Sequence, residues 1–67
     1  MNRDYYGLRQ RIRGKYARIG DFAKALGVTR GTLSLKLMGK SEWSRAEIEK
    51  TAELLELTPD EIMLYFF

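Results

Sequence analysis

Apolar residues along the chain recur at helical spacing and do not alternate with polar residues as in a half-buried strand. Tyr5, Leu8 and Ile12, for example, fall at positions i, i+3 and i+7 of one segment. β-branched residues are sparse, so no strand is predicted. The pattern predicts a compact all-α domain. Its five short helices are expected near 5–15, near 20–26, near 30–38, near 45–56, and from Pro59 through Ile62 and Tyr65.

Residues that start and stop helices stand at the boundaries of these segments. Ser44 and Thr58 are each followed three residues later by a glutamate, which is the capping-box pattern. Pro59 then takes the first position of the last helix, where a missing N–H costs nothing. The other expected boundary residues are two N-caps, Asp4 and Thr29, and two glycines that end helices, Gly27 and Gly39.

The same spacing predicts which side chains face the core. In the second and fourth helices the expected inward residues are Phe22, Ala23, Leu26, Ile48, Ala52 and Leu55. Trp43, just before the fourth helix, is expected to cover the core, with stacking on a base as the alternative. The glutamates of the fourth helix, Glu47, Glu49, Glu53 and Glu56, are expected on its exposed surface with no pocket to shift their pKa.

Composition narrows the possible functions. The 67 residues allow one domain and include neither cysteine nor histidine, so disulfides, thiolate metal sites and histidine catalysis are excluded. We expect no enzyme, cofactor or metal. No apolar run is long enough to span a membrane, and no signal peptide is expected, so a cytoplasmic location is predicted.

Charge is distributed unevenly around the net value of +3. Residues 1–40 hold ten basic and two acidic side chains, whereas residues 41–67 hold two basic and seven acidic ones. The halves therefore carry +8 and −5. Such a directional field suits a polyanionic partner on one side, and the alternative is a set of solvated helix faces that happen to segregate.

The segment DFAKALGVTRGTLSLKLMGK, residues 21–40, resembles the helix-turn-helix of phage repressor and Cro-type regulators. The resemblance rests on Ala23, Gly27 and Leu33: a small residue where the helices approach, a glycine at the turn, and an apolar anchor in the second helix. The five-helix plan extends it over nearly the whole chain. It implies a single domain over 1–67, of the lambda-repressor-like type, with the helix-turn-helix unit at about 20–38.

The segment departs from the family pattern at two positions. Ile19 stands where the family often has glutamine, and Lys36 stands where a second apolar residue is usual. We expect Leu37, four residues after Leu33, to take the core position instead. The face that the second helix of the unit turns toward the core is therefore defined only to within part of a helical turn.

The resemblance implies that the third helix enters the major groove of double-stranded DNA. The implied base-contacting residues are Arg30, Gly31, Ser34 and Leu35. Arg30 would read guanine O6 and N7, and Leu35 would meet a thymine methyl group. The implied phosphate-contacting residues are Thr29, Thr32, Lys36, Gly39 and Lys40, with Arg9 and Arg13 as possible additions. The alternatives are a solvated Arg30, a packed Leu35, and a solvated face for Arg9, Arg11 and Arg13.

The predicted function is that of an operator-binding transcriptional regulator of a phage or prophage, acting on DNA in the bacterial cytoplasm. The resemblance implies a homodimer. Ile62, Tyr65 and Phe66 should face the core, and Met63, Leu64 and Phe67 should form the dimer interface. One rival is a protein-interaction module that uses the apolar end IMLYFF, and another is a basic amphipathic domain on an anionic membrane. Whether the chain is a complete regulator, and whether it represses or activates, stays open.

Overall fold

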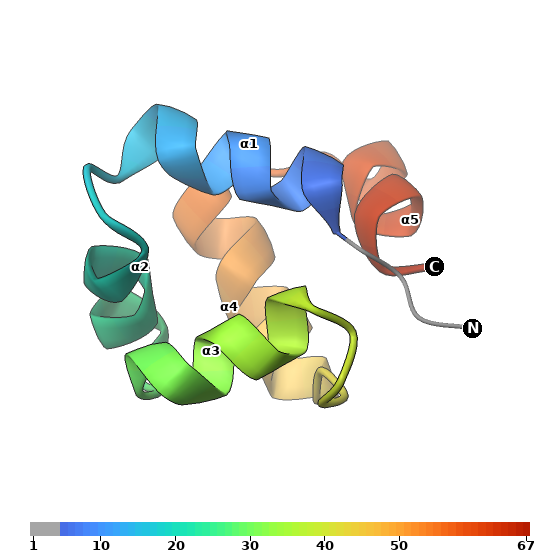
Figure 1. Cartoon of the computed structure of the whole chain (residues 1–67). Coiled ribbons are helices and arrows are strands. Elements are labelled where there is room, and N and C mark those ends of the chain that lie inside the picture. The colour runs from blue at the N-terminus through green and yellow to red at the C-terminus, as the bar shows by residue number, and fades with distance from the viewer. Residues whose placement is uncertain (1–4) are drawn as a thin grey trace.

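The computed structural model describes residues 5–67, and within that range it contains five α-helices and no strand (Figure 1). The predicted all-α class is confirmed. Asp4, expected to cap the first helix, lies outside the described residues. The helices are α1 (Tyr6–Lys15), α2 (Ile19–Leu26), α3 (Arg30–Leu37), α4 (Arg45–Leu55) and α5 (Pro59–Phe66).

Three of the predicted N-caps form as expected. The side chain of Thr29 accepts a hydrogen bond from the Thr32 N–H at 3.1 Å, and Ser44 and Thr58 each complete a capping box. Gly27 and Gly39 adopt the left-handed backbone, with φ of 94° and 76°. These caps set the helix ends locally, because they satisfy N–H and C=O groups that have no partner within the helix.

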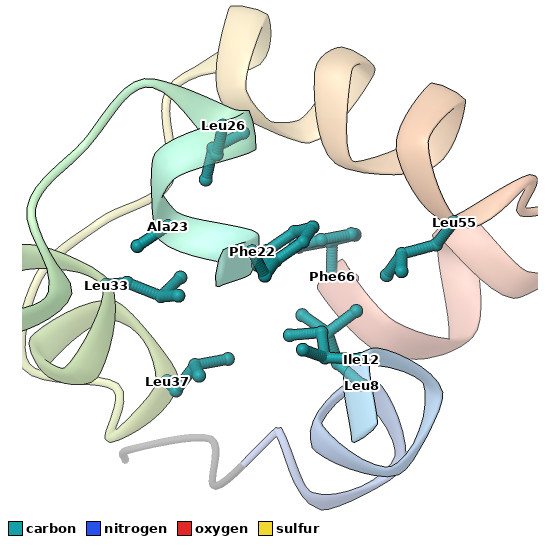
Figure 2. Close-up of a cluster of buried hydrophobic side chains, with 9 residues drawn as sticks. All are labelled: Leu8, Ile12, Phe22, Ala23, Leu26, Leu33, Leu37, Leu55 and Phe66. Atoms are coloured by element: carbon teal, nitrogen blue, oxygen red, sulfur yellow. The ribbon is translucent and has the colours of Figure 1, made fainter. Parts of the chain in front are cut away.

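The core lies where the five helices face one another, and Figure 2 shows its side chains converging from all of them. Leu37 is buried together with Leu33, as predicted for the apolar face of α3. In α4, Leu55 is buried and the half-buried Ile48 packs against the core, as predicted, whereas Ala52 is only half-buried and Thr51, which was not predicted, is fully enclosed. The core residues are Leu8, Ile12, Phe22, Ala23, Leu26, Leu33, Leu37, Leu55 and Phe66.

Helix α5 lies beside the start of α1 (Figure 1). A Cβ atom at Gly7 would lie 2.8 Å from the ring of Tyr65, so this contact depends on glycine. Phe66 packs with its ring centroid 5.1 Å from that of Trp43, and Tyr5 lies 6.0 Å from the same tryptophan. Trp43 therefore covers the edge of the core, as predicted.

Ion pairs join the basic and acidic halves of the chain. Among residues 5–67, three pairs link the two halves: Arg11–Glu61, Lys15–Glu56 and Lys36–Glu47. A fourth, Arg45–Glu49, lies within α4. Over the same range, no helix has both the length and the apolar character that crossing a membrane requires.

Candidate nucleic-acid interface

Helix α3 is held against α2 by the three-residue turn 27–29 and by the packing of buried side chains between the two helices. The N–H of Gly27 donates to the carbonyl of Ala23 at 2.9 Å, which closes α2 before the chain reverses. Ala23 is 1% exposed and Leu33 is 0% exposed, and Figure 2 shows both side chains in the same core cluster, with Leu33 directed to its middle. Because Ala23 is buried, we expect a larger residue at this position to push α3 away from α2, so the small side chain allows the two helices to pack closely.

The outer face of α3 presents all four residues predicted to contact bases. Arg30, Gly31, Ser34 and Leu35 are exposed along one side of the helix. Met38 is exposed as well and follows Leu35 by three positions, so it extends the same face by nearly one turn. Sequence reasoning missed Met38, although its spacing of seven from Gly31 was a usable signal.

Gly31 has no structural reason to be glycine. An added Cβ would meet nothing within 4 Å, and its φ lies outside the left-handed region, in contrast to Gly27 and Gly39. Glycine inside a helix costs about 1 kcal/mol relative to alanine. The sequence therefore carries a local penalty in the first turn of α3, on the surface that faces outward.

The predicted phosphate-contacting residues divide into available and occupied groups. The hydroxyls of Thr29 and Thr32 lie 2.9 Å apart at the exposed start of α3, and Lys40 is exposed beyond its end. The amide of Gly39, in contrast, already donates to the carbonyl of Lys36 at 3.1 Å. The Thr32 hydroxyl and Lys40 stay available for an outside ligand, whereas the Gly39 amide and the Thr29 hydroxyl, which donates to the Thr32 hydroxyl, do not.

Lys36 is placed differently from its expected position at the surface. Its side chain is only 7% exposed, and its ammonium group donates to Glu47 Oε1 and to the carbonyl of Glu42, both at 2.8 Å. The ammonium also lies 5.9 Å from the centroid of the Trp43 ring. Lys36 thus occupies the position at which repressor and Cro-type helix-turn-helix proteins have an apolar residue, and Glu47 neutralises it there, so its charge is not available to the candidate interface.

Glu47 also departs from the expectation of an exposed carboxylate with an ordinary pKa. Desolvation, the largest single influence, would raise its pKa, but hydrogen bonds from Lys36 and Ser44 together lower the pKa below its usual value. Its Oε1 accepts from both the Ser44 N–H and the Lys36 ammonium. One carboxylate therefore caps α4 and fixes the end of α3.

The other glutamates in inter-helix pairs are charged for similar reasons. The backbone N–H of Thr58 and the guanidinium of Arg11 lower the pKa of Glu61, and Lys15 lowers the pKa of Glu56. Arg11, the middle one of the three arginines on α1, is directed to this acidic side and also donates to the Leu55 carbonyl at 3.1 Å. It therefore takes no part in the candidate interface.

Arg9 and Arg13 lie on the opposite side of α1, where a groove of about 860 Å³ opens between α1 and the starts of α2 and α3. Arg18, just before α2, and Arg30, at the start of α3, line the same groove. Sequence reasoning did not single out Arg18, because its place depends on the turn between α1 and α2. The structure thus brings four arginines together beside the outer face of α3.

The pairing of the two halves leaves a basic surface around α3. Within the described range, six basic residues of the first forty have no ion-pair partner. Four of them line the groove and a fifth follows α3, so the positive charge that survives pairing is concentrated on this side. The six residues are Arg9, Arg13, Arg18, Lys24, Arg30 and Lys40.

The last helix divides its apolar residues as predicted. Ile62 and Tyr65 are half-buried and Phe66 is buried. Met63, Leu64 and Phe67 have 61%, 68% and 68% of their surface exposed. These three side chains form an apolar patch on the side of α5 that faces away from the core.

Fold and site together define a small all-α domain in which an exposed helix, α3, is bordered by a basic groove. The chain belongs to the family described as protein of unknown function (DUF739), whose model matches residues 1–67. A comparison with the curated proteins found no match.

Proposed function

We propose that this protein is a sequence-specific, double-stranded DNA-binding transcriptional regulator with α3 as its recognition helix. The observation that carries the proposal is the outer face of α3, where Gly31 lies exposed between Arg30 and Ser34. The resemblance of residues 21–40 to repressor and Cro-type helix-turn-helix proteins supports it. Such a regulator would bind DNA in a bacterial cytoplasm and control phage or prophage genes, in a binding role and not a catalytic one.

Gly31 supports this function because the helix backbone can approach a partner closely at a position without a side chain. The major groove of DNA is about 12 Å wide and admits an α-helix. A first turn with a small residue lets the helix backbone come closer to the base edges. Arg30 then reads guanine O6 and N7, Ser34 donates to a base or phosphate, and Leu35 contacts a thymine methyl group. In this proposal, the helix stability lost at Gly31 is compensated by a closer contact with DNA and not by a contact within the fold.

Positive charge around α3 supplies the sequence-independent part of the binding. Lys40 follows the end of α3, and Arg13 and Arg18 line the neighbouring groove. Each phosphate that these groups neutralise releases a counterion, so affinity falls steeply with salt, with a slope of about 0.9 per contact.

A homodimer accounts for the apolar patch on α5. Met63, Leu64 and Phe67 would meet the same residues of a second copy across a two-fold axis and place two α3 helices about one turn of DNA apart. Changing all three to serine should leave a folded monomer that binds a palindromic site much more weakly. Equal sedimentation of the variant and the natural chain at high concentration would contradict the dimer.

The proposed function is tested by a pair of matched glycine variants, Gly31→Glu and Gly14→Glu. Both glycines are helical with open space at the Cβ position, but Gly14 lies on the side of α1 that borders Leu55 and Glu56, away from α3. Duplexes bound by the natural chain are first selected from a random pool. We expect Gly31→Glu to weaken binding to the selected duplex at least tenfold, about 1.4 kcal/mol, while Gly14→Glu changes it little.

Circular dichroism of the two variants should remain helical, because a Cβ atom at either position would meet nothing within 4 Å. Equal loss of binding in both variants would show that added negative charge alone is responsible and that α3 is not the recognition element. A natural chain that binds no duplex at low salt would overturn the proposal altogether.

A further inference from the structure

The groove between α1, α2 and α3 has a charge that nothing in the described chain balances. Its lining includes four arginines but only one carboxylate, Asp21, which gives it a net charge of +3. Arg13, Arg18 and Arg30 have no ion-pair partner among residues 5–67. Like charges gathered in a concave surface repel one another, so an anion that enters the groove is strongly favoured.

Arg9 adds a second observation that points to an anion. Its Nη2 atom donates to the Leu37 carbonyl at 3.3 Å, which anchors the guanidinium at the wall of the groove. Its Nε atom is buried and has no hydrogen-bond partner within the described residues. The buried Nε is not accessible from the groove, so the donors that suit the oxygens of a phosphate group are the Nη hydrogens that the Leu37 carbonyl does not use.

The size of the charge favours a compact oligophosphate over the DNA backbone. One phosphodiester in the groove brings a single negative charge, whereas a triphosphate brings about four at pH 7. Tyr16 and Ile19, both half-buried, also line the groove and offer it an aromatic and an apolar surface, which a phosphodiester does not use. We propose that this groove is a binding site for an oligophosphate, such as the triphosphate chain of a nucleotide.

The site would regulate DNA binding through Arg30, a consequence that rests on the proposed function. Arg30 lines the groove and also stands at the start of the outer face of α3. A guanidinium that grips phosphate oxygens is withdrawn from a guanine edge, so oligophosphate and DNA exclude each other. The coupling is reciprocal, because each ligand lowers the affinity of the other by the same factor.

The binding site is tested without DNA, by thermal unfolding of the natural chain with tripolyphosphate. Sodium chloride at equal ionic strength and inorganic phosphate at equal concentration are the controls. We expect tripolyphosphate to raise the Tm by about 5 °C or more at ten times its Kd. A rise no larger than that in sodium chloride, or one that inorganic phosphate matches, would overturn the proposal.

A pair of double variants locates the effect. Arg13→Gln with Arg18→Gln removes two cations from the groove, and Arg45→Gln with Lys50→Gln removes two exposed cations from α4. We expect the first pair to lose most of the Tm rise and the second to keep it. Equal shifts in the two double variants would show general charge screening and refute the site.

Displacement of a labelled duplex then tests the regulation separately. Tripolyphosphate should release the selected duplex at concentrations where sodium chloride of equal ionic strength does not. A Tm rise without displacement of the duplex would refute the competition between oligophosphate and DNA but would still support the binding site in the groove. If the chain bound no duplex at all, the proposed function would fail. The unfolding experiment would still show whether the groove binds an oligophosphate.

Discussion

Removal of the Glu47 carboxylate should uncouple α3 from α4 more severely than loss of one surface charge. The substitution Glu47→Ala deletes a carboxylate that accepts from both the Ser44 N–H and the Lys36 ammonium at 2.8 Å. The ammonium of Lys36, on a side chain only 7% exposed, then keeps its hydrogen bond to the Glu42 carbonyl but has no carboxylate beside it. The variant therefore combines a lost cap with a buried charge that has lost its counter-ion.

The two effects can be estimated separately. Loss of the capping interaction costs about 1 kcal/mol. The buried ammonium left without its carboxylate costs about 1–3 kcal/mol more, because Glu47 is partly exposed and water can replace part of the interaction. The expected total of about 2–4 kcal/mol is a large share of the stability of so small a domain, about 5 kcal/mol.

Lys36→Met provides the control, because it keeps an unbranched apolar side chain beside Trp43 and removes the charge. We expect it to change the free energy of unfolding by about 1 kcal/mol or less. The double variant should then lose only about the 1 kcal/mol of the cap. Coupling between the two positions is what distinguishes a buried pair from two independent surface charges.

The measurement is urea unfolding at pH 7, followed by the fluorescence of Trp43, which is the only tryptophan. The natural chain, both single variants and the double variant complete a thermodynamic cycle. If Lys36→Met cost as much as Glu47→Ala, or if the two losses simply added, the structural account of Lys36 would be wrong.

Three further predictions concern acid stability and the glycines of α1. The pKa of Glu61 is lowered from 4.5, so its contribution to stability is complete above that pH and is lost as the pH falls below it. In the Glu61→Gln variant, the free energy of unfolding should therefore depend less on pH in this acid range, as measured by urea unfolding at stepped pH. Gly7→Ala should destabilise the fold by about 1–3 kcal/mol, because its Cβ would lie 2.8 Å from the Tyr65 ring. Gly14→Ala, with open space at its Cβ, should instead stabilise it by about 0.5–1 kcal/mol in thermal unfolding.

The helices were predictable because their signals are local. Apolar spacing and the caps at Thr29, Ser44 and Thr58 depend on residues within one or two turns, and these caps and the five helices formed where expected. The division of the last helix into buried Phe66 and exposed Phe67 followed from spacing alone. Local signals also placed Gly27 and Gly39 in left-handed turns.

The misplaced residues depend on contacts distant in sequence. Lys36 looked like a surface cation because its partner, Glu47, lies eleven residues away on another helix. Thr51 is buried although its hydroxyl has no hydrogen-bond partner within the described residues, and spacing alone favoured its neighbour Ala52. Arg18 joins the groove only because the turn after α1 brings it there. Such positions need the packing of the helices and cannot be read from one segment.

The central proposal, that α3 reads DNA, is tested most directly by the affinity of Arg30→Ala for the selected duplex. Arg45→Ala removes another exposed arginine, at the start of α4, and is the matched control. Fluorescence anisotropy at several salt concentrations should show Arg30→Ala weaker by about 1–3 kcal/mol and less selective at one base pair, with Arg45→Ala close to the natural chain. Unchanged affinity and base preference in Arg30→Ala would contradict a recognition role for α3.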